Sequence, residues 1–290
     1  MANKRKSAAF GLTTGERIFE LVNTFILIVI GLMMLLPFLQ MASKSFSGET
    51  AVLTGNVWFW PVDFQTGTYK YVLRESQFWS SLKVSVIVTV LGTAGAMIIT
   101  CLTAYPLSKT WLYGRKFFVF LFVFCMLFSG GMVPSYILMK SIGFVNTMKV
   151  LIIPGMLGIY NMILLKNFFE EIPEALEESA QLDGAGSLRT LISIVLPMSL
   201  PAIATIGLFY AVGYWDNYMT GLIYIQKPEY KPLQLYLYEL VVETQHVDNA
   251  GNPKTMEALE DAALNTESIR SATIMLTCVP IMCVYPFLQK

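Results

Sequence analysis

Long apolar runs alternate with short polar segments along almost the whole chain, which predicts a helical membrane protein. A helix needs about 20 mostly apolar residues to cross a bilayer. Six runs approach or exceed that length, and we expect spans at residues 19–42, 81–104, 117–139, 150–169, 193–225 and 269–288. Pro154 interrupts the fourth, and the fifth is long and begins with Pro197 and Pro201, so a break or tilt is expected there.

The polar segments between the spans define a tail and loops, and their charges predict an orientation. Lys4, Arg5 and Lys6 precede the first span with no acid before Glu16, so the positive-inside rule places the N-terminus in the cytosol. Six spans then return the C-terminus to the cytosol. We therefore expect a cytosolic tail at 1–18 and a membrane domain at 19–290, with a cytosolic loop at 170–192 and external loops at 43–80 and 226–268.

Composition supports a membrane protein and argues against several other classes. Residues are 55% hydrophobic and 14% charged, whereas soluble domains average about 25% charged. The zero net charge and the single histidine favour neither a nucleic-acid partner nor a zinc site. The four cysteines lie in apolar runs without CxxC spacing and are interpreted as buried hydrophobes. No GxxxxGK[ST] phosphate loop occurs, so any ATPase is expected on another chain.

The cytosolic loop contains an acidic stretch, EALEESAQLDGAGS (Glu174–Ser187), that predicts an ordered helix–turn–helix. Pro173 suits the first helical position, and the glutamates that follow favour the positive end of the helix dipole. Gly184 is expected to end the helix in the left-handed conformation, and Ser187 to cap a second helix. The apolar stripe is formed by Ala175, Leu176, Ala180 and Leu182. Docking on another protein is favoured over a solvated linker, which would be richer in Ser, Gly and Lys.

The segment EESAQLDGAGSLRTLISIVLPMSLP resembles the EAA loop of ABC importer permeases. The family pattern, loosely E-A-A-x-x-D-G-A followed by I-x-L-P, is matched by Glu178, Ala180, Asp183, Gly184, Ala185, Ile194, Leu196 and Pro197. Ser179 replaces one small residue of the pattern by another.

The segments GYWDNYMTGLIYI and KPLQLYLYEL and the C-terminal 33 residues (258–290) are similar to maltose-type carbohydrate permeases, in particular the branch serving complex oligosaccharides. The resemblance covers nearly the whole chain. Family members usually continue past the equivalent of Lys290 with a short basic, glycine-containing tail, so the C-terminus is expected to be truncated.

The resemblance implies an all-α integral membrane protein with the six-helix architecture of type I ABC importer permeases and a cytosolic EAA coupling helix. It implies a transport subunit in a bacterial cell membrane, with no cofactor of its own. The implied partners are a second homologous permease subunit, an ABC ATPase dimer that holds ATP and Mg, an extracytoplasmic solute-binding protein, an oligosaccharide and membrane lipid. The implied ATPase-coupling residues are Glu174, Glu178, Ser179, Ala180, Leu182, Asp183, Gly184 and Ala185.

Aromatic and polar residues near the outer end of the fifth span suit a sugar path, because sugar sites combine aromatic faces with hydrogen-bonding groups. The candidates, with one residue each from spans four and six, are Tyr210, Tyr214, Trp215, Asp216, Asn217, Tyr218, Asn161 and Ser271. The alternatives are an interfacial aromatic belt and helix–helix hydrogen bonds. By resemblance, the turn-rich tip TQHVDNAGNPKT contacts the binding protein through Gln245, His246, Asp248 and Asn249.

Two other functions remain open at this point. A permease for another small solute would share the same coupling loop. An ion-coupled secondary carrier would need embedded ionisable groups, whereas Asp216 is the only acid well inside a predicted span and lies near its outer end.

Overall fold

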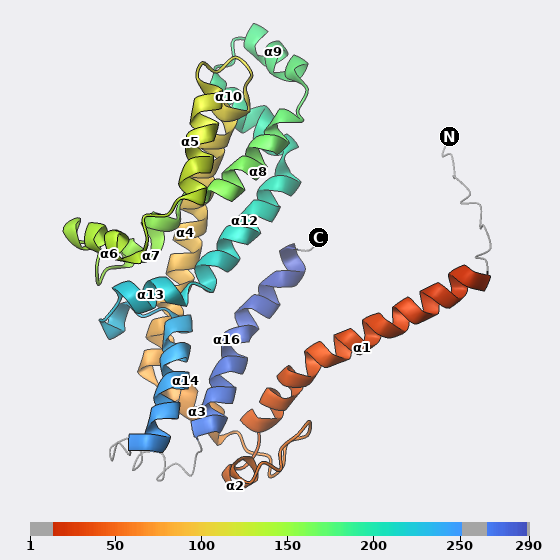
Figure 1. Cartoon of the computed structure of the whole chain (residues 1–290), viewed down its shortest axis with the longest axis vertical. Helices are drawn as coiled ribbons and strands as arrows, with labels where there is room; N and C mark the ends of the chain where they lie inside the picture. Colours follow the sequence, from red (N-terminus) through yellow and green to blue (C-terminus); the bar gives the residue numbers. More distant parts are fainter. Residues whose placement is uncertain (1–13, 251–265, 289–290) are drawn as a thin grey trace. The chain divides into compact units, whose positions relative to one another are not determined.

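The computed structural model describes residues 14–250 and 266–288, which are helical with intervening turns and contain no strand (Figure 1). The prediction of an all-α fold is confirmed for these residues. The chain divides into two compact units, one of residues 1–69 and 253–275 and the other of residues 70–252 and 276–290. Each unit is described by itself.

The first unit contains α1 (Thr14–Ser45), α2 (Glu49–Leu53) and the beginning of α16 (Thr266–Leu288). The segment after α1 is ordered by local contacts. The ring of Phe46 stacks on Phe64 and on Tyr69 with centroid distances of 5.4 and 4.6 Å, and the Ser45 and Tyr69 hydroxyls lie 2.8 Å apart. Residues 43–69, expected to be an external loop, therefore form a folded segment.

The second unit is built around α4, which packs against α8, α12 and α14. Figure 1 shows α9 at one end of this unit and α14 at the other. The helices that belong to it wholly or mostly are α3 (Gly67–Arg74), α4 (Ser76–Ser108), α5 (Arg115–Leu127), α6 (Met132–Ser141), α7 (Met148–Ile152), α8 (Ile159–Glu170), α9 (Glu174–Leu182), α10 (Ser187–Thr190), α11 (Leu196–Met198), α12 (Leu200–Trp215), α13 (Tyr218–Tyr224) and α14 (Leu233–Ala250). A 3₁₀ turn at Ile153–Gly155 follows α7, a π-helical turn at Leu191–Val195 joins α10 to α11, and a second 3₁₀ turn lies at Pro228–Tyr230.

In the described part of the chain, two helices, Gly15–Ser45 within α1 and Ser76–Ser108 (α4), are each long and apolar enough to cross a membrane. The total rises to five if each of three bent pairs is one span. The pairs are Arg115–Leu127 with Met132–Ser141, bent by 108°, Met148–Gly155 with Ile159–Glu170, bent by 41°, and Ser187–Met198 with Leu200–Trp215, bent by 88°. Among the described residues, α16 does not meet this test, so the helices do not establish the predicted six spans.

The bends have local causes. The predicted break at the start of the fifth span is confirmed, because the chain turns at Ser199 between Pro197 and Pro201. Pro154 lies in the 3₁₀ turn at the break of the fourth span, as expected. The third predicted span, residues 117–139, is not a single straight helix. Its helix ends at Leu127, and Gly131, at φ 86°, redirects the chain into α6. Glycine adopts this backbone conformation without steric penalty.

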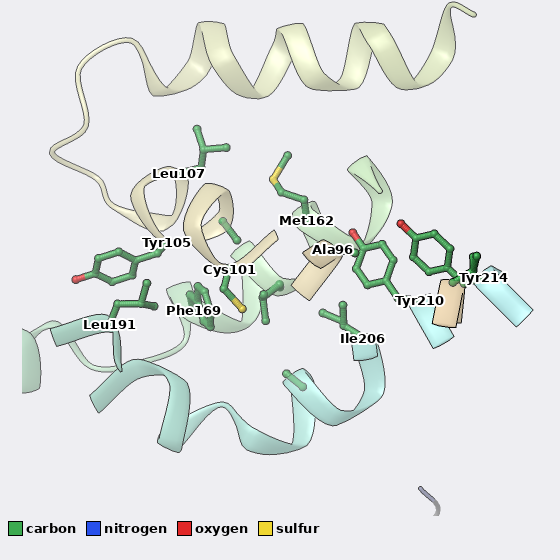
Figure 2. Close-up of a cluster of buried hydrophobic side chains, with 14 of the residues drawn as sticks. Ala96, Cys101, Tyr105, Leu107, Met162, Phe169, Leu191, Ile206, Tyr210 and Tyr214 are labelled. Atoms are coloured by element: carbon green, nitrogen blue, oxygen red, sulfur yellow. The ribbon is translucent and has the colours of Figure 1, made fainter. Parts of the chain in front are cut away.

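Small residues allow α4 and α12 to approach closely. A Cβ atom added at Gly92 of α4 would lie 2.7 Å from the Tyr214 ring of α12, and one at Gly155 would lie 3.1 Å from the Tyr214 hydroxyl oxygen. Beside this contact, toward Tyr105, lies a core of fully buried side chains, which includes Ala96, Met162 and Ile206 (Figure 2). Packing through small residues is a common way to join helices in membranes, where lipid supplies no hydrophobic drive.

Gly92→Ala is expected to lower the free energy of unfolding by about 1–3 kcal/mol, because the added methyl group overpacks the contact with the Tyr214 ring. The matched control is Gly213→Ala on α12, where a Cβ meets nothing within 4 Å. The measurement is the loss of helicity of the detergent-solubilised protein as sodium dodecyl sulfate is increased. Equal midpoints for the two variants would contradict the close packing.

Candidate coupling site and substrate path

The acidic stretch folds as a helix with a defined end. Helix α9 stops at Asp183, and Gly184 adopts φ 80°. The Gly184 N–H donates to the Gln181 carbonyl at 3.0 Å and the Ala185 N–H donates to the Ala180 carbonyl at 2.9 Å. These two bonds form a Schellman motif, which satisfies carbonyls that would otherwise lack partners. The predicted left-handed glycine at this turn is confirmed.

The two helices of this stretch, α9 and α10, each begin one residue away from the predicted start. Pro173 caps α9 and Glu174 is its first helical residue. The predicted cap at Ser187 is wrong, because Gly186 takes that position before α10 and its carbonyl accepts the Thr190 N–H at 3.0 Å. The carbonyl that receives the first bond within the helix belongs to the capping residue.

The two sides of α9 differ sharply in exposure. Glu177 is 4% exposed and Ala180 is 9% exposed, whereas Leu182 is 89% exposed. The expected apolar face containing both Ala180 and Leu182 does not form, because residues two apart on a helix do not face each other. Ala180 packs within the chain, while Leu182 and the exposed Glu174, Glu178 and Ser179 face outward.

A buried ion pair fixes the inner side of α9. The Lys109 Nζ, one residue past the end of α4, donates to Oε1 of Glu177, and the Tyr105 hydroxyl donates to Oε2 at 3.3 Å. The Lys109 and Glu177 side chains are 12% and 6% exposed. The Lys109 ammonium also lies 4.8 Å from the centre of the Tyr105 ring, within cation–π range. Helix α9 is thereby attached to the end of α4.

A second ionic cluster joins the neighbouring helix ends. Glu170, at the end of α8, accepts from Arg115 at the start of α5 and from Lys166 at 2.8 Å. The Arg115 Nε donates to the Leu107 carbonyl of α4 at 2.8 Å. The ends of α4, α5 and α8 nearest to α9 are therefore connected by charged groups.

Sequence reasoning did not single out Glu177. Its neighbour Glu178 matches the family pattern, and the two glutamates look equivalent in the sequence. The available signal was the spacing of three residues between Glu177 and Ala180, which places them on one side of a helix. Lys109, which partners Glu177, is 68 residues away in the chain.

The candidate substrate-path residues separate into a buried and an exposed group. The Tyr210 hydroxyl lies 2.7 Å from the Thr100 hydroxyl and accepts the Gly158 N–H at 2.9 Å. The Tyr214 hydroxyl donates to the Ile152 carbonyl at 2.9 Å. Figure 2 shows the two tyrosines as neighbours at one end of the core, with Tyr105 at the other. In this conformation their hydroxyls join helices, which corresponds to the helix–helix alternative.

Exposure differs among the next residues of the path, which run from the buried Trp215 to the exposed Tyr218. Trp215 is buried, and its Nε1 has no hydrogen-bond partner in the described part of the chain. Asp216 is exposed at the end of α12, and Asn217 caps α13 by accepting the Thr220 N–H at 3.1 Å. Tyr218 is 37% exposed and stacks on Tyr238 of α14 at 5.3 Å.

Two further candidates lie elsewhere. Asn161 is half-buried on α8, three residues after Gly158, the hydrogen-bond partner of Tyr210. Ser271 is buried on α16 and belongs to the first unit.

The residues predicted to contact the binding protein do not have the expected backbone conformation. Helix α14 continues to Ala250, so Gln245, His246, Asp248 and Asn249 are helical and not in turns. The remainder of the predicted tip, residues 251–255, lies outside the described residues.

Comparison with known proteins gives the class of the chain. Residues 112–244 match the family described as binding-protein-dependent transport system inner membrane component. Two relatives are similar to the chain over nearly all of its sequence. The chain belongs to this family, as the resemblance of the EAA loop implied. It is a permease, a transport subunit, and in such importers the ATPase is a separate partner.

Several relatives are similar along their whole length. The chain is 39% identical over 275 residues to the polygalacturonan/rhamnogalacturonan transport system permease protein YtcP of Bacillus subtilis (strain 168), covering 95% of each chain. It is 37% identical over 278 residues to Protein LplC of the same organism, covering 96% of this chain and 92% of LplC. A chain in the crystal structure of a bacterial ABC transporter involved in the import of the acidic polysaccharide alginate superposes with a TM-score of 0.89 at 33% identity, covering 96% of this chain and 98% of that one.

Lys109→Met is expected to loosen α9, because removing one partner of a buried ion pair leaves an uncompensated charge at a cost of about 3–5 kcal/mol. A cost of about 3 kcal/mol corresponds to roughly 100-fold more frequent opening of α9. The measurement is amide hydrogen exchange of peptides covering residues 174–190.

Glu178→Gln is the matched control, since it removes an exposed charge from the next position of the same helix. Its exchange is expected to stay near that of the unmodified protein. Combining Lys109→Met with Glu177→Leu is expected to restore protection, because both buried charges are then absent. Equal exchange in Lys109→Met and Glu178→Gln would show that the ion pair does not hold α9.

Proposed function

We propose that this chain is one of two permease subunits of an ATP-driven importer that moves an oligosaccharide across a bacterial cell membrane. The sugar is delivered by an extracytoplasmic binding protein, and ATP and Mg are bound by a separate ATPase dimer. The family membership and the similarity to permeases for polygalacturonan/rhamnogalacturonan and alginate support this proposal.

The observation that carries the coupling role is the two-sided character of α9. Its inner side is attached to α4 through Glu177 and Lys109, and its outer side exposes Leu182 and Glu178. An exposed leucine beside a carboxylate suits a partner groove that is apolar with a basic rim. The ATPase is the proposed owner of that groove. The Schellman turn at Gly184 then carries movement into α10 and α12.

The proposed topology places α9 and both termini in the cytosol. It is supported by the basic cluster at Lys4, Arg5 and Lys6 and by the positive-inside rule. The six proposed spans are α1, α4, the three bent helix pairs and α16. Residues 43–80 and 226–268 are proposed to be extracytoplasmic, with Gln245, His246, Asp248 and Asn249 contacting the binding protein.

The proposed sugar path uses first the exposed residues Asp216 and Tyr218 and the half-buried Asn217 between them. Aromatic faces bind the apolar faces of sugar rings, while carboxylate and amide groups accept hydroxyl hydrogens. Tyr210 and Tyr214 become available only when their bonds to Thr100, Gly158 and Ile152 open. Asn161 and Trp215 complete the proposed lining in the second unit.

Gly184→Val is expected to reduce binding-protein-dependent uptake at least tenfold, with weaker co-purification of the ATPase. A β-branched residue at φ 80° is strained even in open space, so the turn after α9 changes. Gly186→Val is the matched control, because Gly186 also has open space around it but has φ −72°. The measurements are sugar uptake and the amount of ATPase retained. Normal uptake by Gly184→Val would refute the coupling role of the turn.

Leu182→Cys, in a chain whose four native cysteines are replaced by serine, is expected to react with a membrane-impermeant maleimide only in inside-out vesicles. Leu182 is almost fully exposed, so access depends on which side of the membrane it occupies. Thr54→Cys in the exposed part of the first loop is the opposite control and is expected to react only in right-side-out vesicles. Labelling of both from the same side would overturn the topology.

A further inference from the structure

A groove with cations at one end and apolar side chains along its length runs beside α5 and α8. It has a volume of about 400 Å³ and is lined by Arg115, Lys116, Val119, Phe120, Val123 and Lys166. The cations come from the start of α5 and from α8, and the apolar residues follow along α5. Among the described residues, none of those lining the groove is acidic.

The positive charge of this groove is only partly balanced. Glu170 is paired with both Arg115 and Lys166, so one carboxylate faces two cations. Lys116 is exposed and makes no ion pair within the described residues. The Lys166 side chain is only 10% exposed, which keeps its charge in a fixed place. The groove therefore has an excess of positive charge that suits an anion.

The rest of α5 indicates what kind of anion fits. From Phe117 to Leu127 the helix carries only apolar side chains and Cys125, and none of its residues is buried. A protein partner that neutralised the cations would meet no polar group along the remainder of α5. A molecule with an anionic head and a hydrocarbon chain matches both parts of the surface.

We propose that this groove binds an anionic phospholipid, with its phosphate at Arg115, Lys116 and Lys166 and an acyl chain along Val119, Phe120 and Val123. Basic pockets between membrane helices on the cytosolic side commonly bind anionic head groups. The assignment to the cytosolic leaflet rests on the proposed function, which places α9 and the adjacent start of α5 in the cytosol. A bound lipid would fill the space between α5 and α8.

The test is native mass spectrometry of the purified full-length chain in detergent with equal amounts of phosphatidylglycerol and phosphatidylcholine. The unmodified chain is expected to retain phosphatidylglycerol preferentially. Lys116→Gln is expected to reduce this preference about fivefold, which corresponds to about 1 kcal/mol per basic residue near an anionic surface. Lys140→Gln is the matched control, because Lys140 is an exposed lysine on α6 that does not line the groove, and it is expected to leave the preference unchanged.

A second variant tests the apolar part of the groove. Val123→Trp places a larger side chain along its wall and is expected to reduce retention of both lipids while the preference for phosphatidylglycerol persists. Soluble glycerol phosphate, added in excess, is expected not to displace the lipid, because it lacks the acyl chain.

The proposal would be overturned by no preference in the unmodified chain, by equal losses in Lys116→Gln and Lys140→Gln, or by displacement of the lipid by glycerol phosphate. A lipid-free dimer in the spectrum would likewise overturn it in favour of a second copy of the chain. The assay uses neither ATPase nor binding protein, so its failure leaves the coupling proposal intact. Conversely, lipid binding can hold when uptake of the Gly184→Val variant is normal.

Discussion

Burying a carboxylate requires a cation and hydrogen-bond donors close to it, and Glu177 satisfies that requirement at the junction of α9 with α4. Lys109 provides the charge and Tyr105 provides a hydroxyl. Because this side of α9 must face inward, Leu182 and Glu178 must face outward. The surface offered to a partner is thus a consequence of where one acidic side chain is buried.

The same arrangement determines how far a disturbance at α9 extends. Lys109 directly follows α4, and α4 packs against α8, α12 and α14. The Tyr210 hydroxyl connects α12 to Thr100 of α4 and to the Gly158 backbone before α8. Under the proposed function, a force applied to α9 reaches the candidate sugar residues through two routes, the ion pair into α4 and the turn into α10. Rigid-body rotation of domains about an interface is one of the common forms of conformational switching.

Local chemistry made some features predictable from the sequence. The Asp183-Gly184 pair predicts the helix end because only glycine accepts the left-handed conformation cheaply, and Pro197 and Pro201 predict a break because proline cannot donate a backbone hydrogen bond. The family resemblance depended on the same loop. Features set by distant contacts were not predictable. Glu177 is distinguished from Glu178 by its contacts with Lys109 and Tyr105. The hydroxyl partners of Tyr210 and Tyr214 include backbone groups from other parts of the chain. The bend after Leu127 was also missed, because the apolar run is long enough for one span. The helical course of residues 245–249 was missed because turn-forming residues indicated a loop.

The contact between Tyr214 and the two glycines constrains the kind of motion open to the second unit. The ring fills a notch that exists because Gly92 and Gly155 lack side chains, so it holds α12 in its register on α4. Sliding α12 by one helical turn toward Val88 would bring the ring against a residue that carries a side chain, so the ring would first have to withdraw. A tilt of α4 and α12 together leaves the notch filled. Domain tilting is therefore sterically cheaper than helix sliding in this unit.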